Sequence, residues 1–294
     1  KFYVERINIL GNFNTEETVI RNKLIVDEGD PLNKLLYEKS LDNIKSLNIF
    51  KKVDAKIKDG SNANVKEIDI FVEERPTGEI TLAAGVGTNG TTVGGGLTEK
   101  NFLGKGINLS SSVEISDDSV KGFINYARPN FGNSDNTLIT SLRSTSKDNL
   151  TNFGYKDDNM GFSIGTEFEQ YENLFFSPEF DLNFQDLKTN STATKSIKDQ
   201  AGTYEDFYFN YSFSYDLRNS NFRPSSGSKT IFRQELPVIS DNNEISNVFV
   251  HTKYKTLNEE TRMIGKASFY LKAVNSLDSS DVRISKRAQV PYNS

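Results

Sequence analysis

The sequence predicts a small α+β domain followed by an antiparallel transmembrane β-barrel. In residues 1–75, apolar residues alternate with polar ones in some segments and recur at helical spacing in others. From residue 76 onward the period is two, as expected of strands with one apolar face. We therefore divide the chain of 294 residues into an N-terminal domain, 1–75, and a barrel part, 76–294, with about eleven strands.

The N-terminal domain is predicted to run strand, helix, helix, strand, strand. Residues alternate over 3–10, 52–58 and 65–73, which is typical of strands with one buried face. Between the first two strands the apolar spacing is helical, which predicts a core stripe. Its residues are Ile20, Leu24, Tyr37, Leu41, Ile44 and Leu47.

Both helices carry start signals. Thr15 is a candidate N-cap, because its hydroxyl can accept a hydrogen bond from a free N–H of the first turn. Asp30 is the candidate cap of the second helix. Pro31 would then occupy the first helical position, where its missing N–H is harmless.

The barrel part shows its clearest alternation over 207–217, where aromatic residues alternate with polar ones. A soluble sandwich or a lipocalin-like barrel would also have one apolar face, turned inward, and remains an alternative. Three features favour a barrel whose apolar face is turned outward to lipid. They are strands of ten or more residues, connections that alternate between short and long, and charged residues suited to a water-filled lumen. Those charged residues are Lys121, Arg143, Glu167, Asp181 and Lys266. The Asn89-Gly90 pair also predicts a tight hairpin.

Composition excludes several classes of function. The formal net charge is −5 with both signs mixed, so no basic surface for nucleic acid is indicated. Cysteine is absent and His251 is the single histidine, which argues against thiolate or multi-histidine metal sites and against a catalytic triad. We expect no enzyme activity, no metal and no cofactor. Because His251 alternates with Lys253 and Lys255, it is interpreted as filling the lumen.

Six stretches carry a family resemblance: VERINILGNFNTEETVIRNKL, SLNIFKKVD, EERPTGEITLAAGVGT, KNFLGKG, YARPNF and NFRPSSGSK. In order and spacing they resemble the BamA family of outer-membrane β-barrel assembly insertases. The first two resemble parts of a POTRA domain, and the third resembles the join to the first barrel strand. The last three resemble turns and a strand end of the barrel. The resemblance covers nearly the whole chain.

The chain also departs from the family pattern. Barrels of the family have sixteen strands and an inward-folded loop bearing an R-G-F signature. Because this chain stops at about eleven strands, that loop and the closing strand are expected to be missing. An open set of strands cannot be stable in lipid, since its edges leave backbone groups unpaired. We therefore expect residues 1–294 to be a fragment with an incomplete barrel, and expect further POTRA domains upstream.

The resemblance implies a function for the first barrel strand. In the family this strand lies at a lateral seam that receives unfolded outer-membrane proteins and inserts them as barrels. Glycine weakens a strand, which favours an opening seam, although the glycines would alternatively serve only to bend the sheet. The implied client-binding residues are Glu79, Thr81, Ala83, Gly85, Val86, Gly87 and Thr88.

Two further sites are implied in the POTRA-like domain. Strand 52–58 would be an outer strand able to pair with a client, at Val53, Ala55 and Ile57, unless its lysines merely protect the edge. Arg21 and Glu28 correspond to a region where an accessory assembly lipoprotein docks, or are ordinary surface charges.

The implied location is the outer membrane of a Gram-negative-type cell, with the barrel in lipid and the POTRA domain in the periplasm. The alternative function is a POTRA-barrel transporter that exports a passenger, of the two-partner secretion or translocation-assembly type. A porin or adhesin would not need the first 74 residues, and a lipase would need a histidine beside a serine.

Overall fold

The computed structural model describes residues 1–87, 90–220, 224–241, 243–278 and 281–287. The chain forms two compact units. The first comprises 1–81, 96–111 and 126–130, and the second comprises the other described residues. The expected domain boundary after residue 75 stays a prediction.

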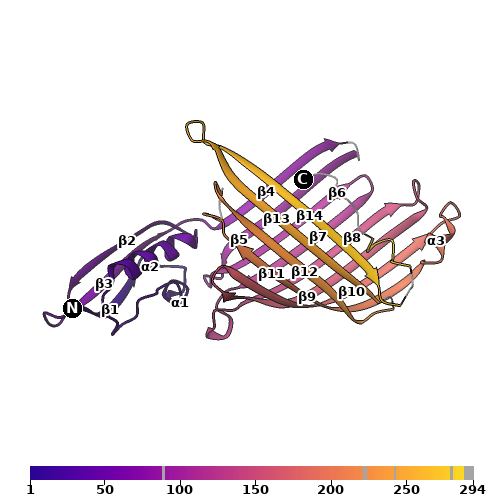
Figure 1. The fold of residues 1–294 in the computed structure, drawn as a ribbon. Coiled ribbons are helices and arrows are strands. Elements are labelled where there is room, and N and C mark those ends of the chain that lie inside the picture. Colours follow the sequence, from indigo (N-terminus) through magenta and orange to yellow (C-terminus); the bar gives the residue numbers. More distant parts are fainter. Residues whose placement is uncertain (88–89, 221–223, 242, 279–280, 288–294) are drawn as a thin grey trace. The chain divides into compact units, whose positions relative to one another are not determined.

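The N-terminal domain has the predicted order of elements (Figure 1). They are β1 (Tyr3–Leu10), α1 (Glu17–Arg21), α2 (Lys34–Ser46), β2 (Phe50–Asp59) and β3 (Val65–Glu74). In its sheet β3 is central, parallel to β1 and antiparallel to β2. The predicted strand-helix-helix-strand-strand fold is confirmed, and β2 is an outer strand as expected.

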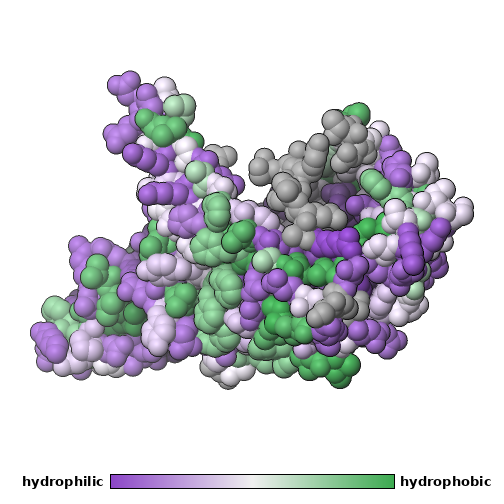
Figure 2. Space-filling model, turned by 45° about the vertical axis from the view of Figure 1, so that its right-hand side comes forward, coloured by the Kyte–Doolittle hydropathy of each residue, from purple (hydrophilic) through white to green (hydrophobic). Residues whose placement is uncertain are grey.

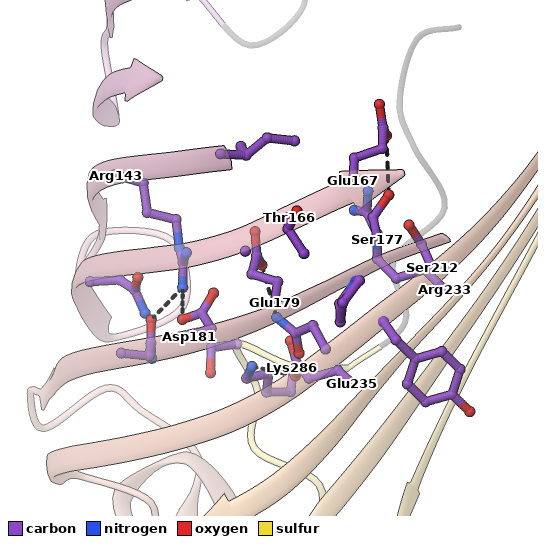
Figure 3. Close-up of a pocket in the computed structure, with 18 residues that line it drawn as sticks. Arg143, Thr166, Glu167, Ser177, Glu179, Asp181, Ser212, Arg233, Glu235 and Lys286 are labelled. Carbon is purple, nitrogen blue, oxygen red and sulfur yellow. Dashed lines mark hydrogen bonds and ion pairs between the residues drawn. The ribbon is translucent and has the colours of Figure 1, made fainter. Parts of the chain in front are cut away.

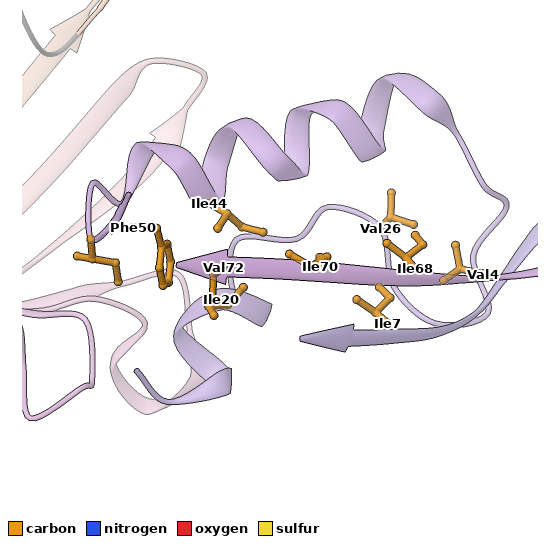
Figure 4. Packing of buried hydrophobic residues seen from close by; sticks show 10 residues of the cluster. Val4, Ile7, Ile20, Val26, Ile44, Phe50, Ile68, Ile70 and Val72 are labelled. Carbon is orange, nitrogen blue, oxygen red and sulfur yellow. The ribbon is translucent and has the colours of Figure 1, made fainter. Parts of the chain in front are cut away.

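Both helices pack their apolar residues onto the sheet. Ile44 of α2 and Ile20 of α1 are fully buried against β3 residues that include Ile68 and Ile70 (Figure 4). The rest of the predicted stripe is partly buried around this core, at Leu24, Tyr37, Leu41 and Leu47. The helical periodicity therefore identified the core face correctly.

The predicted helix starts are wrong. Helix α2 begins at Lys34, and its N-cap is Asn33, whose Oδ1 accepts hydrogen bonds from the backbone of Leu35 and Leu36 at 2.9 and 3.4 Å. The reason is that Pro31 is committed to an isolated bridge with Tyr3 of β1. The chain is therefore still extended where the helix was expected to start.

The first helix also lacks the expected cap. Glu16 occupies the N-cap position of α1 and makes no capping hydrogen bond with its side chain. Thr15 is buried, and within the first unit its hydroxyl accepts a hydrogen bond from Asn101 Nδ2 at 2.9 Å. A contact distant in sequence has thus replaced the local cap.

The barrel part forms one sheet of eleven strands that lie in chain order, from β4 to β14 (Figure 1). Every register given, from β8 to β14, is antiparallel. In the described residues the sheet is not closed, so β4 and β14 are its edges. The strands are β4 (Gly78–Gly87), β5 (Gly90–Phe102), β6 (Ile107–Ser116), β7 (Ser119–Arg128), β8 (Thr137–Asn149), β9 (Tyr155–Tyr171), β10 (Leu174–Thr189), β11 (Gly202–Asp216), β12 (Gly227–Ile239), β13 (Glu244–Asn258) and β14 (Met263–Ser276).

The connections between these strands are mostly short. Two contain a single helical turn, η1 (Phe131–Asn133) and α3 (Lys195–Lys198). The expected separation of short turns from long loops is wrong, since residues 129–136 form a longer connection at the same end of the sheet as the tight turn at 172–173. The predicted Asn89-Gly90 turn lies partly outside the described residues. Among helices of the described residues, none is both long and apolar enough to cross a membrane.

In its central strands the sheet is apolar on the outside and polar on the inside. Along β10, Phe180 is 50% exposed while its neighbour Asp181 is 5% exposed. The same alternation holds at Phe162 and Ser163 of β9. Figure 2 shows hydrophobic residues gathered in patches on the visible surface. The predicted apolar outer face and wet lumen face are therefore confirmed, and the soluble alternative with an apolar interior is excluded for this sheet.

Candidate functional site

The first barrel strand, β4, is an edge strand whose side chains are almost unpacked. Ile80, Leu82 and Val86 are 75%, 84% and 85% exposed. Among the expected client-binding residues, Glu79, Thr81, Ala83 and Gly85 are exposed as well, and Gly87 ends the strand. Thr88 lies outside the described residues.

Gly85 is not required by the local geometry. A Cβ placed on it would meet no atom within 4 Å, and its φ is not among the positive ones. Glycine therefore serves neither close packing nor a turn at this position. What remains is its effect on stability, since glycine loses more backbone entropy than other residues and contributes no packing in a strand.

The two outer strands of the N-terminal sheet differ in how their edges are covered. On β1, the N–H of Val4 donates to Asp30 O at 2.8 Å, and the carbonyl of Val4 accepts from Gly29 at 2.7 Å. Further along, Ile7 is covered by two side chains: its N–H donates to Glu28 Oε1 at 3.0 Å, and its carbonyl accepts from Arg21 Nη2 at 2.9 Å. The edge of β1 is thus closed by its own domain.

The edge of β2 is not closed in this way, because in the described part of the chain no strand lies beyond it. Val53 and Ala55 are half-buried against the core, and Ile57 is exposed. The three side chains expected at a client-binding edge therefore belong to the faces of the sheet. Any client would be held by the main chain of β2, not by these side chains.

The structure brings Arg21 and Glu28 together, at 3.7 Å between Arg21 Nη1 and Glu28 Oε1. Arg21 also donates to Glu17 Oε1 at 2.6 Å. Both residues hold the backbone of Ile7, so they have a structural role independent of any partner. Their docking role stays a prediction.

The inner face of the sheet holds a polar cavity of about 560 Å³ (Figure 3). Arg143 of β8 donates to Asp181 at 2.6 Å and lies 3.4 Å from Asn183 Oδ1. Nearby, Glu179 accepts from Asn210 Nδ2 at 3.2 Å. Three of the five residues expected to face a lumen line this cavity, namely Arg143, Glu167 and Asp181.

The other two expected lumen residues lie elsewhere. Lys121 of β7 forms an ion pair with Glu114 of β6 at 2.7 Å. Lys266 is opposite Tyr254 in the register, which places it on the inner face of β14. In the cavity, opposite charges compensate one another within a hydrogen-bonded network, as burial of charge requires. In the same network Ser177 Oγ donates to Glu167 Oε2 at 3.1 Å, and paired charges of this kind are those expected of a polar lumen.

Sequence reasoning missed Arg283, which is one of the largest fully buried side chains among the described residues. Its guanidinium donates to Asp206 at 2.7 Å, to Tyr208 at 3.0 Å and to Gln185 at 3.2 Å. Its backbone N–H donates to Glu244 Oε1 at 2.6 Å. Residues of β10 and β11 therefore hold the Arg283 side chain on the inner face, and Glu244 of β13 holds its backbone.

The expectation that the loop with the R-G-F signature is missing stays a prediction, and the letters R-G-F do not occur in residues 1–294. Even so, residues 281–287 turn to the inner face, where Lys286 also forms an ion pair with Glu235 at 2.7 Å. No local pattern marks Arg283, since its partners lie 39 or more residues away in sequence.

The interpretation of His251 as a lumen residue is also wrong. His251 shares its face of β13 with Phe249, whose ring contacts Phe269 of β14, and the opposite face carries the buried Glu244. Its Nδ1 lies 2.9 Å from Thr230 Oγ1. His251 is therefore on the outer, apolar face.

An N-terminal α+β domain followed by an inside-out antiparallel sheet defines a class of outer-membrane barrel proteins with a POTRA-type domain. Comparison with known families supports this classification for both the N-terminal domain and the barrel part. The Omp85 superfamily domain matches residues 101–289, and the POTRA family described as a surface antigen variable number repeat matches residues 2–75. The chain belongs to the Omp85 superfamily. Family and fold together indicate the outer membrane as its location.

Individual relatives are similar over most of this chain. Over 232 residues it is 25% identical to the outer membrane protein assembly factor BamA of Neorickettsia risticii (strain Illinois), which covers 77% of this chain and 31% of that protein. The crystal structure of BamA from Haemophilus ducreyi lacking POTRA domains 1–3 superposes with a TM-score of 0.77 at 22% identity, covering 96% of this chain and 57% of that one. CdiB from Acinetobacter baumannii superposes with a TM-score of 0.56 at 12% identity, covering 94% and 53%.

The chain spans less than a third of the length of the curated relatives that it matches. The structural similarities, both below 25% identity, concern the fold alone.

Proposed function

We propose that the protein containing this chain receives unfolded outer-membrane proteins and catalyses their folding and insertion as β-barrels at the edge of β4. The observation that carries the proposal is the exposed, glycine-containing edge of β4 in an otherwise continuous sheet. Membership of the Omp85 superfamily and relatives named as outer membrane protein assembly factors support it.

The mechanism follows from the cost of an unpaired strand in lipid. Each unpaired backbone group in hydrocarbon costs several kcal/mol, so the edge of β4 has to be paired at all times. Exchanging one antiparallel partner for another replaces like hydrogen bonds with like, and the net free-energy change is small. Because the side chains of β4 are weakly packed, few side-chain contacts have to be broken during that exchange.

Recognition through the main chain explains how one protein can serve many clients. A strand edge pairs with any extended segment, because the N–H and C=O groups do not depend on the client sequence. No nucleotide, metal or covalent chemistry is needed in this scheme. We accordingly propose that the protein is not an enzyme and uses no cofactor.

The POTRA-type domain would contribute on the periplasmic side. Its open β2 edge offers a second template for a client strand, whereas the β1 edge is closed by Asp30, Arg21 and Glu28. Accessory assembly lipoproteins would dock near Arg21 and Glu28, whose side chains are partly exposed. Outer-membrane lipid would surround the apolar outer face.

Passenger export through the lumen is the second candidate function. The polar inner cavity favours it, as does the similarity in fold to CdiB. That similarity is weaker than the one to BamA, with TM-scores of 0.56 and 0.77. The segment around Arg283 also occupies the inner face, which argues against a free path along it.

A photo-crosslinking experiment tests the β4 edge. In the full-length protein, a crosslinker would be placed singly at Thr81, Ala83, Val86 or Thr88 during assembly of a substrate barrel. We expect crosslinks to the client at these positions. At Ile164, an outward-facing position in the central strand β9, they should be sparse.

Client capture at Ile164 as readily as at Val86 would contradict the proposal, as would no capture anywhere on β4. A third probe at Ser163, on the inner face, distinguishes the alternative. If a passenger crosslinks there and not at β4, export through the lumen is the better conclusion.

A further inference from the structure

Two lysines lie on the outer face of the sheet, where lipid is expected. Lys253 and Lys255 are exposed and share the face of β13 that carries Phe249. Their neighbours across the strands are small: Lys253 is opposite Ser228 and Ala267, and Lys255 is opposite Gly265. Because these neighbouring side chains are small, they do not cover the ammonium group of either lysine.

Neither lysine has an ionic partner among the residues that the structure describes. The carboxylates nearest in sequence, Glu259 and Glu260, are in the turn after β13 and are not within ion-pair distance. By contrast, Lys229 lies 3.4 Å from Asp216 on the inner face of β12. The outer-face lysines are thus charges without a counter-charge from the described protein.

Both lysines lie in the second half of β13, toward one end of the strand. Lys255 lies three residues before the end of β13 at Asn258, and Lys253 lies five residues before it. With a rise of about 3.4 Å per residue and a strand tilt of about 45°, they lie roughly 7 and 12 Å from the strand end along the membrane normal. Lysine side chains at such depths extend toward the headgroups, because their charge is strongly disfavoured in hydrocarbon.

Other polar groups on the same face need no partner. Tyr211 Oη donates to Gln234 at 2.7 Å, and Gln234 Nε2 donates to Asn247 at 2.5 Å. This ladder across β11, β12 and β13 satisfies itself, so it does not call for a docked protein. The lysines differ because only an anion can satisfy them, and the surrounding phase supplies one in the form of lipid phosphate.

We propose that Lys253 and Lys255 form a binding site for the phosphate of an acidic phospholipid, in the leaflet at the end of the sheet where β13 ends. The Ser228 hydroxyl, directly across from Lys253, is placed to donate a hydrogen bond to the same phosphate. This proposal requires only that the barrel lies in a membrane. It is independent of the proposed assembly function.

The test measures lipid retention by the full-length protein. The protein would be purified in detergent and titrated with phosphatidylglycerol or phosphatidylcholine, and bound lipid counted by native mass spectrometry. The double variant K253Q/K255Q should bind phosphatidylglycerol about 25-fold more weakly, which corresponds to roughly fivefold for each lysine near a charged membrane surface. The matched control K266Q/K272Q removes two lysines from the inner face of the adjacent strand and should leave Kd unchanged.

Equal retention by wild type and K253Q/K255Q, an equal loss in the control, or equal affinity for phosphatidylcholine would overturn the proposal. Competition by inorganic phosphate alone would also overturn it, since the site would then recognise a free anion and not a lipid. Heat-modifiable migration on gels would show that each variant retains a folded barrel. None of these measurements involves a client, so a failure here is distinguishable from a failure of the assembly mechanism.

Discussion

The N-terminal domain and the eleven-stranded sheet use the same alternation of residues with opposite results. In β3, Ile68 and Ile70 are buried beneath the helices, and Phe71 on the opposite face is 37% exposed. In β10, Phe180 is exposed, and Asp181 is the buried neighbour. Alternation therefore shows that a strand has one apolar and one polar face. Whether the strand is surrounded by water or by lipid determines which face is turned inward.

The difference also determines how charges are handled. In the N-terminal domain, Asp69 is covered by Lys58 and Asn8, and hydrogen bonds from these two side chains lower the pKa of its carboxyl. In the sheet, charges are concentrated inside, where Arg143 and Asp181 compensate each other. The eleven-stranded sheet thus pairs its charges on the inner face, while the N-terminal domain pairs the buried Asp69 on the face of β3 that is turned away from the helices.

The largest expected effect comes from placing a charge in the apolar core of the N-terminal domain. Residues 1–75 produced alone are predicted to melt cooperatively, because the core is complete within them. Ile68→Asp should abolish that transition, since an unpaired buried carboxylate costs several kcal/mol and a domain of this size has little stability to lose. Circular dichroism during heating measures both.

Phe71→Asp is the control for this prediction, because Phe71 lies on the other face of β3 and is partly exposed. It should lower the melting temperature far less than Ile68→Asp. If the wild-type piece shows no cooperative transition, the boundary near residue 75 is wrong.

The second effect tests the reversed polarity of the sheet. In the full-length protein in lipid vesicles, Phe213→Arg should lower the free energy of unfolding by about 2–4 kcal/mol, because Phe213 points outward and stacks on Phe176. Ser212→Arg, one residue earlier, should lower it far less, since Ser212 lines the polar cavity. Equilibrium unfolding in urea gives both values, and equal losses would contradict the assignment of the faces.

Much of the fold could be predicted because it depends on period and order. The core positions Ile20 and Ile44, the order of elements along the N-terminal domain and the outward-facing aromatic residues all follow from local patterns. His251 could also have been placed correctly, since it lies two residues from Phe249 on an alternating strand. The polarity of Lys253 and Lys255 suggested a lumen face, but residues two apart on a strand share a face, so Phe249 indicates the outer face for His251.

What failed to be predicted depends on contacts that are distant in sequence. Pro31 looks like a helix start, but its pairing with Tyr3 keeps the chain extended until Asn33. Thr15 looks like a cap, but Asn101 binds its hydroxyl. Arg283 lies in no periodic segment, and only the assembled inner face shows its partners.

The smallest effect concerns the charged margin of the N-terminal domain. Glu74 accepts hydrogen bonds from the backbone of Asn14 and Thr15, at 3.1 and 2.7 Å, and from the Asn14 side chain at 2.9 Å. Burial raises the pKa of the Glu74 carboxyl, but these hydrogen bonds outweigh burial, and the net pKa lies below its ordinary value. A lowered pKa in the folded state means that the carboxylate stabilises the fold above the ordinary pKa of about 4.3, and that this contribution is lost as the pH falls through the folded-state pKa.

Glu74→Gln isolates this contribution, because other lowered carboxyls such as Asp69 titrate equally in wild type and variant. At pH 7 we expect the variant to be less stable by less than about 1 kcal/mol, since the site is partly exposed and solvent screens it. That difference should shrink once the pH falls below about 4.3, because protonated Glu74 then resembles glutamine. Urea unfolding of residues 1–75 at a series of pH values measures the difference. A gap that stays constant from pH 7 to about pH 3 would show that the Glu74 charge does not hold residues 14 and 15 in place, and that the uncharged hydrogen bonds suffice.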